Sequence, residues 1–463
     1  MRTRLIVISL LCLLAVPAAA QASPRQVMSF EAPAELLDYS RVDVTLAEIK
    51  AFGVTQVRQV VYMRNFAPRP RSKKKPRINL ANPNAYPAGT WSRLDTLMHA
   101  AQAKGVKVML TPTGPVPKWA TKKRKDYVTR PSAKFFGQWV TALARRYGAQ
   151  VSMWSIWNEP NQPQFLLPQY RKGKPYSPGL YRGLYRAAYK GIRKVTANRR
   201  DKILIGETSP RGNIHIVHPL RFLRGIACVN ASYHRTKKCA KLKANGYAHH
   251  AYTTRTGPRF VPPDKNDVTI GVIKRLVRAL DKAGRRGAIP KHLKIYLTEF
   301  GIQSYPDKLS GVPLARQPAY YAISEHIAYV NSRVAMISQY LMRDDAPRPR
   351  SEGYRYRGFE SGLRKHNGTK KPSYKAFANP LAAERYGKRD VLWGLIRPQP
   401  TTTKVTIQVR RKGSRKWSTL RTLTTTSRGV YGLAARHRKG QRFRVRWRST
   451  DGHRHTGPPI SAY

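Results

Sequence analysis

An apolar, strand-like run alternates with a helical segment eight times between residue 27 and about residue 382. The runs are rich in Val, Ile and Leu, and several of the helical segments end at a glycine. Such alternation builds a parallel sheet, and eight units in one domain favour a closed (β/α)8 TIM barrel of the α/β class. An open doubly wound sheet is the alternative, but no glycine-rich nucleotide loop follows an early strand. The predicted strands are 27–30, 54–62, 106–111, 151–157, 203–206, 247–252, 293–298 and 334–341.

The pattern changes after about residue 390, where short segments become apolar at alternate positions. Gly and Ser residues separate these segments, which is typical of a small antiparallel β-sandwich. The segment 391–395 is either its first strand or a linker. We therefore expect a barrel domain over 23–388 and an all-β sandwich domain over 389–463.

The N-terminal sequence predicts a secretory signal peptide over residues 1–22. Arg2 and Arg4 precede an apolar run over 5–16, which is too short to span a bilayer, and small residues follow it. An uncleaved anchor is the alternative. We expect a secreted mature protein, extracellular or associated with the cell envelope, with no membrane span.

Two cysteines remain beyond the signal segment, Cys228 and Cys239. In an oxidising compartment such an isolated pair forms a disulfide. A zinc site is the alternative, but two cysteines supply only half of a tetrahedral set. We predict the disulfide and no metal site.

The chain carries 88 Lys and Arg against 23 Asp and Glu, a formal net charge of +65. A protein so basic is expected to bind polyanions in a salt-dependent manner. Because the cations are spread along the chain, we interpret the charge as a surface property that gives non-specific binding. The alternative is that it draws an acidic sugar chain to a basic cleft.

Two of the predicted strands are each followed by one carboxylate. The fourth runs into Asn158–Glu159–Pro160, and the seventh into Thr298–Glu299. Barrel enzymes place their catalytic groups at the C-terminal ends of the strands, so both carboxylates are expected at the same mouth. A carboxyl pair can hydrolyse a glycosidic bond, one group as acid and the other as nucleophile.

The segment WSIWNEPN (154–161) resembles the Asn-Glu-Pro signature of clan A glycoside hydrolases, the cellulase-like superfamily, and IYLTEFG (295–301) resembles their nucleophile strand. The resemblance covers about residues 27–382. It implies Glu159 as acid/base, Glu299 as nucleophile and Asn158 as a hydrogen-bond partner of the substrate 2-hydroxyl.

Further positions match the same resemblance. Arg58, on the second predicted strand, is expected to hydrogen-bond the nucleophile and keep it ionised. His250 and Tyr252 match the His-x-Tyr pattern, in which the Tyr orients the nucleophile and the His lines the sugar site. His249 points the other way along a strand, so we expect it to pack in the fold.

One feature departs from the clan. Many members end the eighth strand with a Trp that stacks on a sugar, whereas this chain offers Gln339 and Tyr340. Trp119 is an alternative stacking surface, and Trp157 is as compatible with the core as with the site. Glu207 ends the fifth predicted strand and competes with Glu299 as a catalytic carboxylate, but lacks the nucleophile context.

The sequence thus predicts a retaining glycosidase that cleaves O-glycosidic bonds in an oligo- or polysaccharide, as a monomer and without a cofactor. A transglycosylase of the same fold is one alternative. A secreted, non-catalytic binder of anionic cell-wall polymers is another, although the intact Glu159 and Glu299 pair argues against it.

Overall fold

The computed structural model describes residues 25–195, 201–236, 238–356, 358–398 and 401–463. The predicted signal segment 1–22 lies outside the described residues. None of the helices in this part of the chain is both long and apolar enough to cross a membrane.

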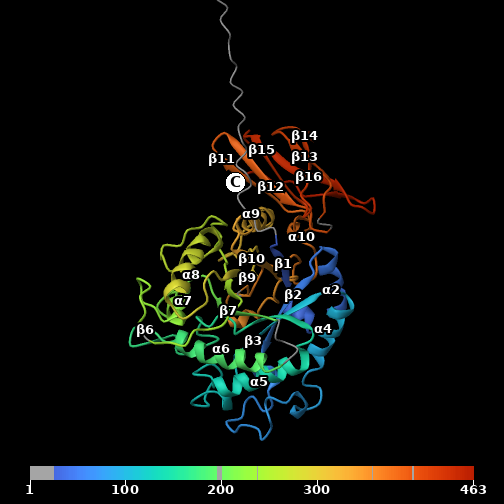
Figure 1. The fold of residues 1–463 in the computed structure, drawn as a ribbon. Coiled ribbons are helices and arrows are strands. Elements are labelled where there is room, and N and C mark those ends of the chain that lie inside the picture. The colour runs from blue at the N-terminus through green and yellow to red at the C-terminus, as the bar shows by residue number, and fades with distance from the viewer. Residues whose placement is uncertain (1–24, 196–200, 237, 357, 399–400) are drawn as a thin grey trace, which may run out of the picture.

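Eight parallel strands close into a barrel in the order β1-β10-β9-β8-β7-β4-β3-β2, which confirms the predicted TIM barrel. Figure 1 looks into the barrel, with the helices arranged around it. The strands are β1 (Val27–Glu31), β2 (Gln56–Tyr62), β3 (Lys107–Thr113), β4 (Val151–Ser155), β7 (Lys202–Thr208), β8 (Gly246–His250), β9 (Lys294–Phe300) and β10 (Val334–Tyr340). A small hairpin of β5 (Tyr170–Arg171) and β6 (Lys174–Pro175) lies outside the barrel.

Several helices end next to a glycine, as the sequence predicts. In α5, the Ser132 side chain accepts from the Phe135 amide, and Gly148 follows the last turn. A 3-10 turn, Ile270–Val272, precedes α8. The helices are α1 (Pro33–Leu36), α2 (Val42–Ala51), α3 (Met63–Phe66), α4 (Ser92–Ala103), α5 (Ala133–Tyr147), α6 (Ser177–Arg193), α7 (Pro219–Ala227), α8 (Lys274–Arg286), α9 (Gln317–Tyr329) and α10 (Pro372–Ala378).

The barrel interior is built in layers. One layer is apolar and consists of side chains from six strands: Met109, Met153, Leu204, Ala248, Tyr296 and Met336. Because alternate residues of a strand face the same side, the next inward positions lie two residues further on. Five of these six positions are polar and buried, namely Thr111, Ser155, His250, Thr298 and Ser338, and the sixth is Gly206. The apolar layer thus lies beneath a polar layer nearer the C-terminal ends of the strands, and we call this polar layer, with the side chains around it, the chamber.

The C-terminal region is all-β, as predicted, and consists of two antiparallel sheets that share a hydrophobic core. The boundary expected between residues 388 and 389 falls in the turn between β11 and β12, so the first strand of this region begins at Leu381. One sheet contains β11 (Leu381–Tyr386), β12 (Arg389–Leu395) and β15 (Val430–Arg436). The other contains β14 (Ser418–Thr424), β13 (Lys404–Arg410), β16 (Arg442–Arg448) and β17 (Arg454–Thr456).

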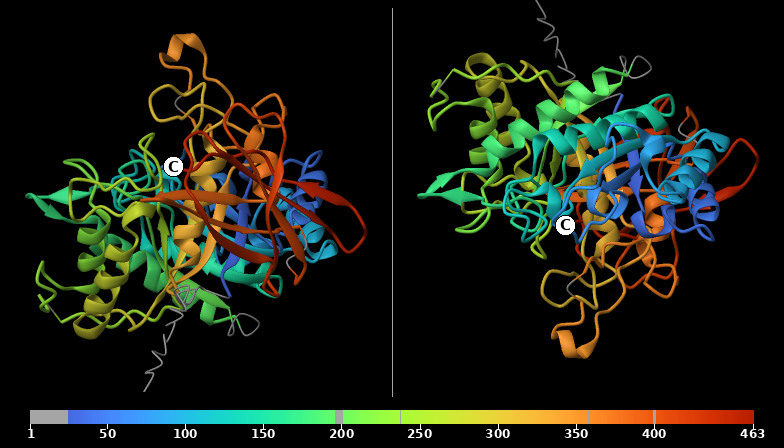
Figure 2. Two further views of the ribbon diagram at one scale, coloured as in Figure 1. Left: turned by 90° about the horizontal axis from the view of Figure 1, so that it is seen from above. Right: turned by 90° about the horizontal axis from the view of Figure 1, so that it is seen from below.

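The β region packs against the flank of the barrel beside α9 and α10 (Figure 1), and Figure 2, left, views the molecule from that side. Trp393 of β12 stacks on His326 of α9, with ring centroids 5.0 Å apart. Arg397 donates from Nη2 to both carboxylate oxygens of Glu325, at 2.8 and 2.7 Å, and both side chains are buried. The interface therefore includes a buried ion pair between the barrel and the β region.

We predict that Arg397→Ala destabilises the whole protein, because Glu325 would remain buried without its cation. Removing one partner of a buried pair costs about 3–5 kcal/mol. Urea unfolding followed by tryptophan fluorescence measures the loss. The exposed Arg385→Ala in the same region is the control, and an equal effect of the two substitutions would contradict the prediction.

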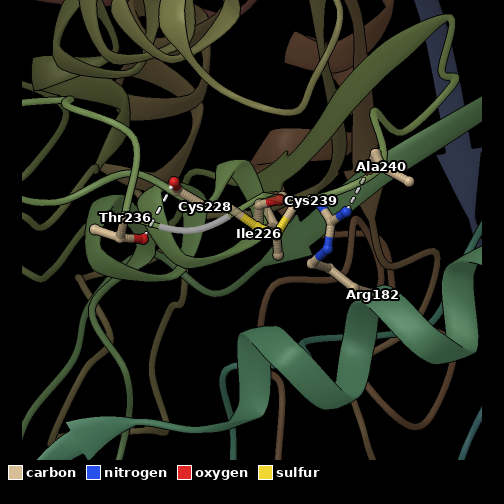
Figure 3. Close-up of a disulfide and its surroundings, with 6 residues drawn as sticks. All are labelled: Arg182, Ile226, Cys228, Thr236, Cys239 and Ala240. Carbon is tan, nitrogen blue, oxygen red and sulfur yellow. Dashed lines mark hydrogen bonds between the residues drawn. A yellow bond between two sulfur atoms is a disulfide. The ribbon is translucent and has the colours of Figure 1, made fainter.

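Cys228 and Cys239 form the predicted disulfide, with an S–S distance of 2.08 Å. The bridge closes the loop that leads from α7 into β8, at the barrel end opposite the C-terminal ends of the strands. Arg182 of α6 donates to the carbonyl of Ile226 in the last turn of α7 and, at 2.6 Å, to that of Ala240 in this loop (Figure 3). The disulfide therefore stabilises the fold and takes no part in the chamber.

Replacing both cysteines by serine should lower the free energy of unfolding by about 2–3 kcal/mol, because the bridge restricts the unfolded chain over a short loop. Chemical unfolding of the double variant and of the wild type gives the difference. Titration of two free thiols in the unfolded, unreduced protein would contradict the bridge.

Candidate active site

The guanidinium of Arg58, on β2, lies at the centre of the polar chamber and is fully buried. A guanidinium carries five N–H donors, and here each has its own acceptor. Nη1 donates to Glu31 Oε2 at 2.5 Å and to Glu299 Oε2 at 3.1 Å. Nη2 donates to Asn158 Oδ1 at 2.8 Å and to Glu207 Oε2 at 3.0 Å. Nε donates to Thr111 Oγ1 at 3.0 Å. The predicted contact between Arg58 and Glu299 is present, and four further strands or strand ends meet at the same group.

His250 is the second centre of the chamber. Its Nδ1 lies 2.9 Å from Glu159 Oε1, and its Nε2 lies 2.7 Å from Glu207 Oε2. The same Nδ1 is 3.6 Å from Glu299 Oε2. Since the imidazole is fully buried beneath the carboxylates, it does not line the sugar site as expected. It joins the two strand-end glutamates to the buried Glu207 instead.

Exposure separates the four carboxylates of the chamber into two pairs. The side chains of Glu159 and Glu299 keep 13% and 9% of their surface accessible. Those of Glu31 and Glu207 keep 2% and 0%. Only Glu159 and Glu299 can therefore contact a molecule that enters the chamber, whereas Glu207, their competitor in the sequence, belongs to the supporting network.

Burial and the neighbouring cations shift the pKa values of the two buried carboxylates in opposite directions. Burial opposes the charge on Glu207, but Arg58, His250 and Ser155 outweigh it and lower its pKa to about 2. At Glu31 burial dominates over Arg58 and raises the pKa to about 8. Glu207 is therefore an anion at neutral pH, whereas Glu31 retains its proton.

Glu159 and His250 are hydrogen-bonded to each other, and each affects the pKa of the other. Burial raises the pKa of Glu159, although its hydrogen bond to His250 opposes the shift. Burial disfavours the charge on His250, but Glu299, Glu159 and Glu207 together raise its pKa to about 10. A carboxyl with a raised pKa next to a basic imidazole can both give and accept a proton, as an acid/base group must.

Aromatic side chains surround the exposed carboxylates. Tyr252, just after β8, donates from its hydroxyl to Glu299 Oε1 at 2.8 Å, in the orienting position that the resemblance implies. Tyr340 at the end of β10 packs edge-on against Phe359, with centroids 4.9 Å apart, and Phe359 also contacts Tyr252. These three rings are half-buried and form one wall of the chamber mouth.

Two of the predicted aromatic positions are not at the mouth. Trp119 is 1% exposed, donates to the carbonyl of Pro68 and packs on Phe135, so its prediction as a sugar platform is wrong. Trp157 is fully buried against Phe136 and belongs to the core. Its φ of +74° turns the chain out of β4, which ends at Ser155, two residues earlier than predicted.

His249 is the packing residue that we expected. Its ring bonds Thr208 and the carbonyl of Val268, and burial lowers its pKa to about 4. In the part of the chain that is described, no group of three or more His, Cys, Asp or Glu is arranged to hold a metal ion.

Two residues of the chamber, Glu31 and Phe359, were not predicted from the sequence. Glu31 directly follows the predicted strand 27–30, so the rule that found Glu159 and Glu299 would also have found it. Phe359 lies in the long segment between β10 and α10, where no periodicity assigns a position. Only the folded path of that segment brings Phe359 to the end of β10.

An eight-stranded parallel barrel with Asn158 and Glu159 after β4 and Glu299 on β9 defines a glycoside hydrolase of clan A. The family model described as "Cellulase (glycosyl hydrolase family 5)" matches residues 22–331. The chain belongs to this family and is a glycosidase. No curated protein sequence gives a significant match.

Solved structures are similar to this chain at low sequence identity. The monomeric β-xylosidase from Caulobacter crescentus CB15 is 16% identical over 91% of this chain and 94% of its own, with a TM-score of 0.50. A family 39 glycoside hydrolase from Bacteroides cellulosilyticus WH2 is 16% identical over 88% of this chain and 80% of its own, with a TM-score of 0.49. The endo-β-1,4-mannanase from Thermotoga petrophila is 10% identical over 96% of this chain and 98% of its own, with a TM-score of 0.47.

The raised pKa of His250 predicts that the stability of the protein depends on pH. Because its folded pKa is raised from 6.5 to about 10, its contribution is fully present below 6.5 and is lost as the pH rises through about 10. The free energy of unfolding should fall across that window in the wild type and fall less in His250→Gln. Urea unfolding at a series of pH values tests this. The exposed His234→Gln should keep the wild-type slope, and an unchanged slope in His250→Gln would be the contrary result.

Proposed function

We propose that the protein is a secreted, monomeric, retaining glycosidase that cleaves O-glycosidic bonds of an oligo- or polysaccharide by double displacement. The observation that carries the proposal is the pair of accessible glutamates, Glu159 and Glu299, which face one nitrogen of His250. The family assignment supplies the reaction class.

The two carboxylates lie close enough together for retention. Glu159 Oε1 and Glu299 Oε2 are 2.9 and 3.6 Å from the same Nδ1 atom, so the distance between these two oxygens cannot exceed the sum of those distances. Retaining glycosidases hold their carboxyl groups about 5–5.5 Å apart, whereas inverting ones need about 6.5–9.5 Å to admit a water molecule. The geometry is therefore compatible with direct attack by a glutamate.

The environments of the two glutamates suit different roles. Both oxygens of Glu299 are engaged, Oε2 by Arg58 and Oε1 by Tyr252, which fixes the orientation of the carboxylate for attack on the anomeric carbon. Glu159 is bonded through Oε1 to His250, and no described residue bonds its Oε2. That oxygen can give a proton to the leaving group and later take one from water.

Asn158 can bind the substrate through its amide nitrogen. Its Oδ1 accepts from Arg58 at 2.8 Å, which leaves the NH2 group as the donor. A donor beside the nucleophile can bond the sugar 2-hydroxyl, and this bond strengthens in the oxocarbenium-like transition state. The half-buried rings of Tyr340 and Phe359 offer an apolar wall for a sugar face.

Export is proposed from two features. Residues 1–22 have the composition of a signal peptide, and the Cys228–Cys239 bridge needs an oxidising compartment to persist. The N-terminal sequence of the protein recovered from culture medium tests this proposal.

Glu159→Gln and Glu299→Gln should each lower kcat by at least about 10²–10⁴-fold on an aryl glycoside identified from a panel, with unchanged folding. Glu159→Gln should recover most on substrates with a good leaving group, since these need no acid. Glu299→Gln should not recover in this way, because the bond-forming group is missing. Circular dichroism verifies the fold, and the exposed Glu352→Gln is the control.

The anomeric form of the first product, followed by NMR, distinguishes the mechanisms. Retention is expected. An inverted product would contradict double displacement, wild-type activity in Glu299→Gln would contradict the assigned nucleophile, and inactivity on every glycoside tested would favour the non-catalytic binder.

A further inference from the structure

The C-terminal β region carries an unusual charge distribution. Between Val391 and Thr450 the sequence contains sixteen Lys and Arg and no Asp or Glu. The nearest carboxylate before this stretch, Asp390, is buried and bonded to His437 and Gln441. Nothing in the stretch itself can neutralise its cations.

The strand register gathers many of these cations on one face of the sheet β14-β13-β16-β17. On β16, alternate residues Phe443, Val445 and Trp447 enter the core shared with the other sheet. The intervening residues are Arg442, Arg444, Arg446 and Arg448, so all four point away from that core. Neighbouring strands extend this row with Lys404 and Arg410 of β13 and Arg454 of β17. We call these seven residues the arginine face.

The arginine face is electrostatically unfavourable in the isolated protein. Arg410 lies directly opposite Arg442, and Arg448 directly opposite Arg454, and like charges in such pairs are destabilising. Burial and the charges of Arg446 and Arg410 lower the pKa of Arg444. Among the described residues, none of the seven takes part in an ion pair with a carboxylate, so the anions that would stabilise this face must come from outside the protein.

The other side chains of this face are suited to sugar hydroxyls. Thr406, Thr422 and Gln408 lie between the cations, and the Gln408 Oε1 accepts from Arg444 Nε at 2.8 Å. The Trp417 ring is covered by Arg444 at 4.3 Å and flanked by Arg410 at 5.1 Å. Single-stranded nucleic acids are bound largely by stacking bases on free aromatic rings, which this face does not offer among its described residues.

We propose that the arginine face binds a linear polysaccharide that carries carboxylates, such as a polyuronate. Neighbouring arginines on β16 lie about 6.7 Å apart and adjacent strands about 4.8 Å apart, so a chain with a carboxylate on each repeat meets several guanidinium groups at once. Guanidinium and carboxylate pair through two parallel hydrogen bonds. The choice of a polysaccharide rests on the proposed glycosidase function, while the anionic character rests on the face alone.

The test is a binding measurement on the full-length protein with polygalacturonate as the probe. A triple variant, R442Q/R446Q/R448Q, removes three exposed cations of the arginine face. The control, R186Q/K190Q/K194Q, removes three exposed cations from α6 and the residue that follows it, and changes the net charge equally. We expect Kd to rise at least about tenfold in the first variant, because several charge-assisted bonds are lost, and less than about twofold in the control.

Two further measurements keep the result independent of folding and of catalysis. In the wild type, polygalacturonate should protect Arg442, Arg446 and Arg448 from an arginine-specific reagent while Arg186 stays reactive. In Glu299→Gln, binding should be unchanged, so a failure of the catalytic assignment would not affect this result.

Equal loss of affinity in both triple variants would overturn the proposal, since binding would then be delocalised over the whole basic surface. Equal protection of Arg186 would do the same. Stronger binding of single-stranded DNA than of polygalacturonate, lost in the R442Q/R446Q/R448Q variant, would show that the face selects phosphate chains and would overturn the polysaccharide assignment.

Discussion

Arg58 is the interaction on which the rest of the chamber depends. A buried guanidinium is tolerated only when its charge and its five donors are satisfied, and removing one partner costs several kcal/mol. Here the five acceptors come from β1, β3, β7, β9 and the end of β4. The closed barrel therefore brings together the acceptors that satisfy Arg58, and the same hydrogen bonds set the positions of Asn158 and Glu299.

Charge balance explains why so many carboxyl groups can share one small space. Four carboxyl groups lie around two cationic groups, Arg58 and His250. Burial raises the pKa of Glu31 and Glu159 and so favours their protonated forms, while the cations keep Glu207 ionised. The buried pair thus supports the accessible pair: Glu207 holds both cations in place, and His250 connects it to Glu159.

The strong positive charge has two different structural contexts. In the chamber, Arg58 and His250 are surrounded by carboxyl groups and are neutralised within the protein. On the arginine face of the β region, cations lie opposite cations without such neutralisation. Net charge alone does not separate these cases, because they differ in which groups the fold places side by side.

The sequence by itself determined the barrel, the all-β region and the strand ends that carry Glu159 and Glu299, because these follow from local periodicity and from short motifs. It also placed Arg58 and Tyr252 correctly, since they lie on or just after predicted strands. Only the tertiary structure decided that Glu207 is fully buried, that Trp119 is core, and that Phe359 packs against the end of β10. Burial and loop paths depend on contacts between distant segments, and the periodicity of one segment does not contain them.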